Sequence, residues 1–301
     1  MNWLIWFLKE KISILCITWN IGGIPSDYTY DIRDLFTKNA FYKNNQAPDI
    51  IIIGMEEIVE LDLINILSIN TNEESVSNWT KNLTNTLEDI YSHTYIQSSI
   101  LHLIGIFCIC FTKIELDEKI KIVDTSVIKT GLFGTLGNKG YVSLFLSYNN
   151  ILISFAIAHL EAGKGSNQER INTLKQILDS KNEFNYQKFK KSDFFFIMGD
   201  LNFRIDTSFE SAFEMIQNKK YKDLLRFDQF YAYCKQKKDF AMITEGEINF
   251  APTYKFVSGS NNYINDADNM RIPSWTDRVL FSNKKDVDLF TLLKDNYLLK
   301  G

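Results

Sequence analysis

Polar residues directly follow short apolar runs at several points in this sequence of 301 residues. Asp200 and Asn202 come after a run rich in phenylalanine. Because side chains alternate along an extended chain, we expect these two residues to lie on the same side. The Asp carboxylate could then orient or deprotonate a water molecule, and the Asn amide could hold an oxyanion. Taken alone, an Asp at the end of a strand is more often a turn former or a helix cap.

Three other apolar runs also end in residues that bind ions or protons. Glu56 and Glu57 follow one run, and a carboxylate there suits Mg²⁺, which binds oxygen ligands and keeps several waters. The pair also suits the start of a helix, where acidic side chains are favourable. His159 ends the second run; a neutral histidine is a base or a hydrogen-bond donor, and a protonated one stabilises phosphate charge. Asn20 ends the third run, and a structural role remains open for it and for His159.

A glycine-rich segment over residues 131–140 contains Lys139. Its glycines allow the backbone to turn tightly beside an anion, and the lysine supplies a point charge. The segment lacks the spacing of a Walker loop. A plain hairpin is the alternative interpretation.

Donors for phosphate groups occur late in the sequence, at Tyr254, Lys255 and Arg271. Arginine can hold a phosphate through two parallel hydrogen bonds. Asp277 lies close behind Arg271, and its carboxylate could orient a partner histidine or lysine. A surface loop of mixed charge is the alternative for each of these residues.

The apolar runs themselves are of strand length and rich in β-branched and aromatic residues, which predicts β-strands. They cover residues 12–19, 50–55, 100–111, 151–158, 194–198 and 279–281. Continuous apolar runs are typical of strands that are buried on both faces. Helical patterns lie between them at residues 74–90, 166–178 and 226–236, the second of which opens on a capping box. The alternation of the two predicts an α/β fold, a layered sandwich in one domain.

Composition narrows the class of protein further. Hydrophobic residues make up 45% and charged residues 23%, as in ordinary globular proteins, and the net charge of -4 argues against salt-driven binding of nucleic acid. The four cysteines form no C-x-x-C pair, which favours a reduced, cytoplasmic protein. Residues 1–8 are apolar but too short to span a membrane. We expect them to form a terminal turn on the core, with an edge that touches a membrane as the alternative.

The motifs taken in order resemble those of the inositol polyphosphate 5-phosphatases, which are members of the DNase-I-like superfamily. They are TWN, MEE, GNKG, AHLEAG, GDLNFR, PTYKF and PSWTDR, and they cover roughly residues 12–282. The resemblance implies a four-layer α/β sandwich, in which two mixed β-sheets pack face to face with helices outside. It also implies hydrolysis of the 5-phosphate of phosphoinositides, such as PI(4,5)P2 or PI(3,4,5)P3, or of soluble inositol polyphosphates, with Mg²⁺ as the cofactor.

The resemblance further implies a role for each candidate residue. Glu57 resembles the metal ligand, and Asn20 helps to bind metal or phosphate. His159 would contact the phosphate that is cleaved, Asp200 would orient or activate the attacking water, and Asn202 would hold a phosphate oxygen. The clamp for neighbouring inositol phosphates would consist of Lys139, Tyr254, Lys255 and Arg271.

The sequence departs from the family pattern at two places. Asn269 stands where the family usually has a lysine, two residues before Arg271, which would weaken a preference for a 4-phosphate. The family also ends with a Ser-Asp-His-x-Pro-Val segment, which forms a core strand and whose histidine pairs with the aspartate seen here as Asp277. The sequence stops at residue 301, about where that segment would begin. We therefore expect one catalytic domain over residues 1–301 that lacks its final core strand, and only weak activity from this chain.

Two other functions remain open beside the 5-phosphatase. A related metal-dependent phosphodiesterase, such as a nuclease or a sphingomyelinase, would share the general motifs. A non-catalytic phosphoinositide-binding protein would explain the missing histidine. For the first function we expect a monomer with a phosphoinositide or inositol phosphate substrate, no nucleic-acid partner, and an optional peripheral contact with cytosolic membrane faces.

Overall fold

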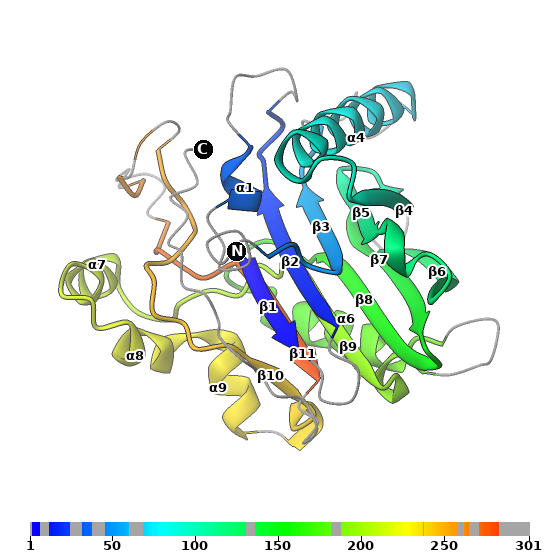
Figure 1. Ribbon diagram of the computed structural model, residues 1–301. Coiled ribbons are helices and arrows are strands. Elements are labelled where there is room, and N and C mark those ends of the chain that lie inside the picture. The colour runs from blue at the N-terminus through cyan, green and yellow to red at the C-terminus, as the bar shows by residue number, and fades with distance from the viewer. Residues whose placement is uncertain are drawn as a thin grey trace.

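The computed structural model places the chain in two β-sheets that pack face to face, as Figure 1 shows. It describes residues 2–6, 12–24, 32–37, 46–59, 69–130, 136–181, 188–236, 238–257, 260, 262–264 and 271–282. Asn269 and the end of the chain lie outside these described residues.

The first sheet has five strands in the order β1-β2-β3-β5-β4. Their bounds are β1 Asn2–Trp6, β2 Ser13–Asn20, β3 Ile50–Glu56, β4 Tyr95–Leu103 and β5 Ile106–Lys113. The pair β2 and β3 is parallel, and the other pairs are antiparallel. The sheet is therefore mixed, as the family resemblance implied.

The second sheet has six strands in the order β10-β11-β9-β8-β7-β6. Their bounds are β6 Ile120–Thr130, β7 Leu136–Tyr148, β8 Ile151–His159, β9 Phe194–Asp200, β10 Ile243–Glu245 and β11 Asp277–Ser282. Here β8 and β9 are parallel and the other pairs are antiparallel. Each sheet thus contains one parallel pair, whose two strands end at the same edge.

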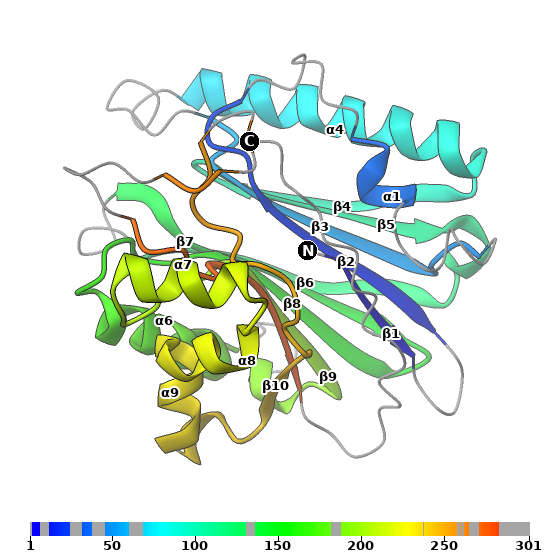
Figure 2. The same cartoon turned by 90° about the vertical axis from the view of Figure 1, so that its left-hand side faces the viewer.

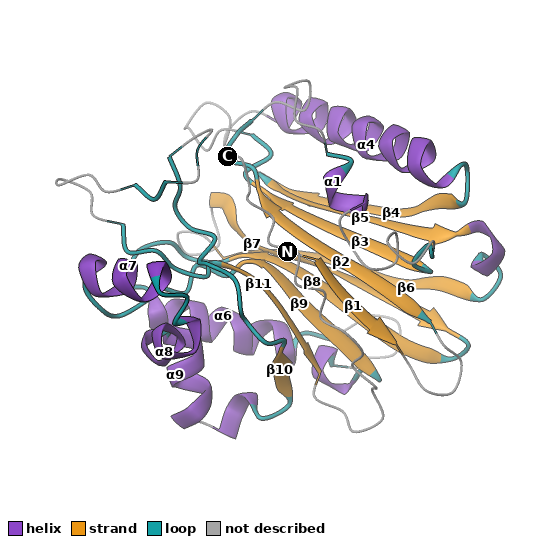
Figure 3. Cartoon of the chain, turned by 60° about the vertical axis from the view of Figure 1, so that its left-hand side comes forward, coloured by secondary structure: helices purple, strands orange, loops and turns teal. Residues whose placement is uncertain are grey.

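Helices cover the outer faces of both sheets. Figure 2 shows α4 (Ile69–Tyr91) lying along the first sheet, with α1 (Asp34–Thr37) beside it. The second sheet carries α6 (Asn167–Asp179), while α7 (Phe209–Gln217), α8 (Tyr221–Leu224) and α9 (Gln229–Gln236) lie on the same side of the molecule (Figure 3). Short 3₁₀ helices occur at Ile114–Leu116, Phe189–Lys191, Leu225–Phe227 and Lys238–Phe240. The four-layer sandwich predicted from the sequence is confirmed.

The packing explains why the strands are continuously apolar. Alternate residues of β3 enter different cores: Ile50 and Ile52 face the second sheet, whereas Ile51, Ile53 and Met55 face α4. Strand β8 is divided in the same way between the core shared by the two sheets and the core beneath α6. Both faces of these strands are covered, so neither face needs polar residues.

Two expectations about single elements are wrong. Residues 100–111 form a hairpin of β4 and β5 instead of one strand, because the chain turns at Gly105, whose φ of 74° is readily adopted by glycine. The amino-terminal residues form β1, paired antiparallel with β2, instead of a terminal turn.

Helix boundaries differ from the expected ones in smaller ways. Ser166 precedes α6, but its side chain makes no capping hydrogen bond, so the predicted capping box does not form. Residues 225–227 form a 3₁₀ turn before α9, and α4 begins earlier than expected. Among the described residues, no helix is both long and apolar enough to cross a membrane.

Candidate active site

The candidate site lies where the parallel strand pairs of the two sheets end. In the first sheet, β2 ends at Asn20 and its neighbour β3 is followed directly by Glu57. In the second sheet, β8 ends at His159 and its neighbour β9 ends at Asp200. Residues that are far apart in the sequence therefore meet because the carboxyl ends of parallel neighbours share an edge.

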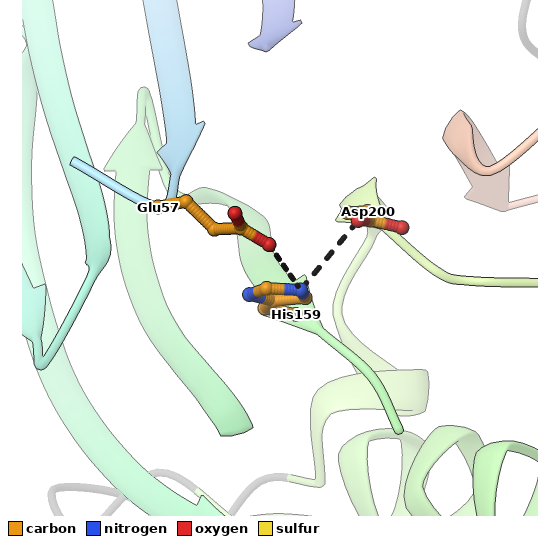
Figure 4. Close-up of side chains that lie close together, drawn as sticks. All are labelled: Glu57, His159 and Asp200. Carbon is orange, nitrogen blue, oxygen red and sulfur yellow. Dashed lines mark ion pairs between the residues drawn. The ribbon is translucent and has the colours of Figure 1, made fainter. Parts of the chain in front are cut away.

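Figure 4 shows the centre of this group, in which His159 lies between two carboxylates. Its Nε2 is 3.7 Å from Oε1 of Glu57 and 3.5 Å from Oδ2 of Asp200. The side-chain amide of Asn20, at the end of β2, bridges the same two oxygens, with Nδ2 at 3.2 Å from Glu57 Oε1 and 2.9 Å from Asp200 Oδ2. The four predicted residues thus form one polar cluster.

Burial sets the charge state of His159. The side chain is almost fully buried, and Nε2 contacts Nζ of Lys139. Burial first, and then the charge of Lys139, lower the pKa of His159 to about 3, although Asp200 acts in the opposite direction. Burial also lowers the pKa of Lys139, against the charges of Asp200 and Glu57. Near neutral pH the imidazole is therefore neutral.

Asp200 and Asn202 are brought together by a turn instead of by alternation along an extended strand. Strand β9 ends at Asp200, and Asn202 has a φ of 56°, in the left-handed region. The Asn202 backbone N–H donates to Oδ1 of Asp200 at 3.0 Å, and Nδ2 donates to the carbonyl of Leu160 at 3.0 Å. Glu57 also has a positive φ, of 54°. Such backbone strain in residues other than glycine concentrates at functional sites.

Asp277 lies beside Asp200, because the two residues are paired across β9 and β11. Its Oδ2 accepts hydrogen bonds from the hydroxyls of Thr253 at 2.6 Å and Thr276 at 3.1 Å. Burial first, and then the charge of Asp200, raise the pKa of Asp277 to about 6. Its Oδ1 is buried and receives no hydrogen bond within the described part of the chain.

The candidate phosphate clamp is only partly assembled in the described residues. Arg271 Nη1 donates to the hydroxyl of Tyr254 at 3.0 Å. Lys139 lies against His159 instead, on the catalytic side of the group. Lys255 is exposed, and among the described residues its ammonium has no recorded hydrogen bond or ion pair.

Arg204 belongs to the same site but was not singled out from the sequence. Its guanidinium donates from Nε to the carbonyl of Asn202 at 3.1 Å and contacts Asn202 Oδ1. It also lies over the ring of Tyr254, 4.0 Å from the centroid. The GDLNFR motif contains this arginine, so its spacing of two from Asn202 was the available indication.

The oxygen donors fit a hard divalent cation. One ligand atom each from Glu57, His159 and Asp200 lies within 4.8 Å of the others. The Glu57 side chain is 31% exposed, so water can complete the shell of an ion. Since Nε2 of His159 is engaged with Lys139, the two carboxylates are the more suitable ligands for such an ion. The side-chain amide of Asn20 turns its Nδ2 toward these carboxylates, and its oxygen accepts from the Gly22 backbone N–H at 3.0 Å.

Comparison with known proteins identifies the family of this chain. Residues 17–296 match the profile of the family described as endonuclease/exonuclease/phosphatase family 2. The chain is 31% identical over 294 residues to human synaptojanin-2, covering 92% of this chain and 19% of that protein. It is 33% identical over 274 residues to phosphatidylinositol 4,5-bisphosphate 5-phosphatase INP51 of Saccharomyces cerevisiae, covering 90% and 28%. The chain therefore spans less than a third of the length of either relative.

Solved structures share the fold. The inositol polyphosphate 5-phosphatase domain of SPsynaptojanin, in complex with inositol (1,4)-bisphosphate and a calcium ion, has a TM-score of 0.78 at 26% identity, covering 92% of this chain and 77% of that one. Cimex nitrophorin in its ferrous NO complex has a TM-score of 0.64 at 20% identity, covering 89% of this chain and 85% of that one. The second likeness concerns the fold alone.

Proposed function

We propose that this chain, which belongs to endonuclease/exonuclease/phosphatase family 2, hydrolyses the 5-phosphate of phosphoinositides or of soluble inositol polyphosphates with the help of Mg²⁺. The observation that carries the proposal is the cluster of Asn20, Glu57, His159 and Asp200 at the shared strand ends. The names of the relatives support the substrate class, since INP51 is a phosphatidylinositol 4,5-bisphosphate 5-phosphatase. The SPsynaptojanin domain binds an inositol bisphosphate together with calcium.

The residues suit transfer of a phosphoryl group to water, which depends on positioning and on neutralising charge. Bound by Glu57 and its neighbours, Mg²⁺ would supply Lewis acidity to a phosphate oxygen. Asp200 orients the attacking water and takes its proton. Its carboxylate is held in place by hydrogen bonds from Nδ2 of Asn20 and from the backbone N–H of Asn202. His159 contacts the phosphate as a neutral imidazole, and the adjacent Lys139 brings positive charge.

The remaining residues select the substrate. Asn202 holds a phosphate oxygen through its side-chain amide. Tyr254 and Arg271 form a joined pair of donors for a phosphate next to the 5-position, and Arg271 is exposed and open to a ligand. Lys255 is exposed on the same segment and adds a further cation. Oδ1 of Asp277 receives no hydrogen bond within the described residues and could orient a partner group.

The test measures phosphate release with the enzyme in excess over the substrate, so that weak turnover is detected. The substrates are PI(4,5)P2 in vesicles and soluble inositol 1,4,5-trisphosphate, with Mg²⁺ or with EDTA, and nicking of plasmid DNA serves as the comparison. We expect Mg²⁺-dependent release from at least one of them, and its loss in Glu57→Gln and Asp200→Ala. Glu210→Gln, at an exposed residue of α7, is the matched control and should keep parental release. DNA nicking without phosphate release, or parental release by Asp200→Ala, would contradict the proposal.

One observation favours a second function, which is binding without turnover. Oδ1 of Asp277 receives no donor from the described residues, so the catalytic group is incomplete within them. A non-catalytic protein would bind inositol (1,4)-bisphosphate in the presence of a divalent cation, yet release no phosphate even in a single-turnover experiment. Calorimetry beside the release assay separates the two functions.

A further inference from the structure

We propose that Arg204 is a positioning residue that orients the amide of Asn202 and at the same time holds the ring of Tyr254. Arg204 would thereby join the hydrolytic end of the site to the residues that grip the neighbouring phosphate. The inference rests on the proposed function, because its consequences concern phosphate hydrolysis. Four contacts of Arg204 support this inference: two with Asn202, one with Tyr254 and one with Gln229.

The first side of the guanidinium determines which way the Asn202 amide points. Nε donates to the Asn202 carbonyl at 3.1 Å, and Nη2 contacts the amide oxygen Oδ1. Because an arginine has only donors, it selects the oxygen and turns Nδ2 away from itself. Nδ2 then donates one N–H to the carbonyl of Leu160 at 3.0 Å. The second N–H of Nδ2 has no recorded acceptor within the described residues and remains available to an oxyanion.

The flat face of the guanidinium holds Tyr254. The carbon Cζ of Arg204 lies 4.0 Å from the centroid of the ring, within the range of a cation–π contact. At the far end of the ring, Arg271 donates to the hydroxyl at 3.0 Å. The ring is thus held on its face by one arginine and at its tip by another. A change in Arg204 would reach Arg271 through this ring.

A network of buried hydrogen bonds holds the backbone of Arg204 in place. Its backbone N–H donates to Oε1 of Gln229 at 3.2 Å, and the same oxygen accepts from Nη2 of Arg170 at 2.7 Å. Arg170 is fully buried and also donates to the carbonyls of Glu161 at 2.8 Å and Gly163 at 2.7 Å. The first residue of α9 and a buried residue of α6 therefore set the position of the chain at Arg204.

The proposed role of Arg204 depends on the planar shape of its guanidinium as well as on its charge. The positive charge of Arg204 also reaches Lys139, where it opposes protonation. A purely electrostatic role would survive replacement by lysine, which keeps the charge. The proposed role would not survive it, because an ammonium cannot make two parallel hydrogen bonds and a flat stack together.

The experiment compares Arg204→Lys and Arg204→Met with the parental chain in phosphate release from inositol 1,4,5-trisphosphate. We expect kcat to fall about 10- to 100-fold in both variants, as is usual when a group that orients a reacting residue is removed. KM should rise as well, because Tyr254 loses its support. Arg226→Lys is the matched control, since the Arg226 side chain is 72% exposed and lies in a surface ion pair with Asp223. Parental kcat in Arg204→Lys would overturn the proposal.

Double variants separate the two sides of the arginine. In an Asn202→Ala background, Arg204→Lys should lower kcat by less than about 3-fold further, because residues that act as a unit are not additive. In a Tyr254→Ala background, the same substitution should no longer raise KM. A full additional loss in both backgrounds would mean that Arg204 acts independently of both residues, and would overturn the proposal.

A measurement without turnover distinguishes failure of this inference from failure of the proposed function. In protein labelled with ¹⁵N-asparagine, the side-chain amide signals of Asn202 should shift in Arg204→Lys. They should also shift in Tyr254→Leu, which serves if the lysine variant does not fold. Unchanged signals would overturn the role of Arg204 even if the chain is an active phosphatase. A parental chain that releases no phosphate, with shifted signals, would refute the activity and keep the positioning role.

Discussion

Replacing Arg278 with methionine would remove the shared counter-charge of two acidic side chains next to the site, the buried Asp228 and the partly buried Glu245. Arg278 follows Asp277 on β11, and its side chain and that of Asp228 are fully buried. Nη1 of Arg278 lies 2.7 Å from Oδ1 of Asp228. Nη2 lies 2.5 Å from Oε2 of Glu245, and Nε donates to Oε1 of the same residue at 2.8 Å. The arginine therefore connects β11 to β10 and to the start of α9.

The expected cost follows from this burial. Removing one partner of a buried ion pair typically costs about 3–5 kcal/mol, because the remaining charge is left uncompensated. A total free energy of unfolding of about 5–15 kcal/mol is usual for a domain, so the variant should fold but be marginal. Glu245→Gln leaves Arg278 paired with Asp228, and it should cost only about 1–3 kcal/mol.

The cost should also depend on pH in a defined direction. Burial raises the pKa of Glu245 even beside Arg278, and loss of the arginine would raise it further. The folded variant then binds more protons than the unfolded chain, so its stability falls as pH rises through the raised pKa. Arg278→Met should therefore be more costly at pH 8 than at pH 5.

Urea unfolding at the two pH values measures both effects. Lys222→Met is the control, because Lys222 and Glu247 form an ion pair with side chains that are 81% and 52% exposed. That variant should change the free energy of unfolding by less than about 1 kcal/mol. A loss below about 1 kcal/mol in Arg278→Met at pH 8, or an equal loss at both pH values, would refute the reasoning.

Three further predictions concern the strand ends. Gly199→Ala should lower the free energy of unfolding by at least about 2 kcal/mol, measured by thermal or urea unfolding. The φ of Gly199 is 135°, and a Cβ there would lie 2.0 Å from the Ala158 carbonyl oxygen. Gly165→Ala is the control and should leave the stability unchanged, because no atom lies within 4 Å of the added Cβ. The pKa of His159 is lowered to about 3 from its usual 6.5, so its contribution to stability is complete above pH 6.5 and is lost as pH falls toward 3. His159→Gln should remove that slope, which is at most about 1.4 kcal/mol per pH unit. Mg²⁺ at about 100 times its Kd should raise the free energy of unfolding by about 2.7 kcal/mol, and Glu57→Gln should abolish the rise.

Local chemistry in the sequence determined much of the fold. Continuous apolar runs predicted strands covered on both faces, and residues of β3 and β8 indeed alternate between two cores. The alternation of strands and helices predicted the layered class. The prediction of one strand over residues 100–111 was wrong. The chain turns at Gly105, which has a positive φ, and the residues on either side of it belong to the two antiparallel strands β4 and β5.

The sequence also identified the polar residues at the strand ends, because their types and order are local properties. Only the tertiary structure decided which of them meet. Asn20 and Asp200 lie 180 positions apart and hydrogen-bond at 2.9 Å because the two sheets pack face to face. Arg204 likewise lies over the ring of Tyr254, which is far away in the sequence, through a contact that no spacing in the chain specifies. The pKa of His159 is likewise a property of burial and of its neighbours, which exist only once the chain has folded.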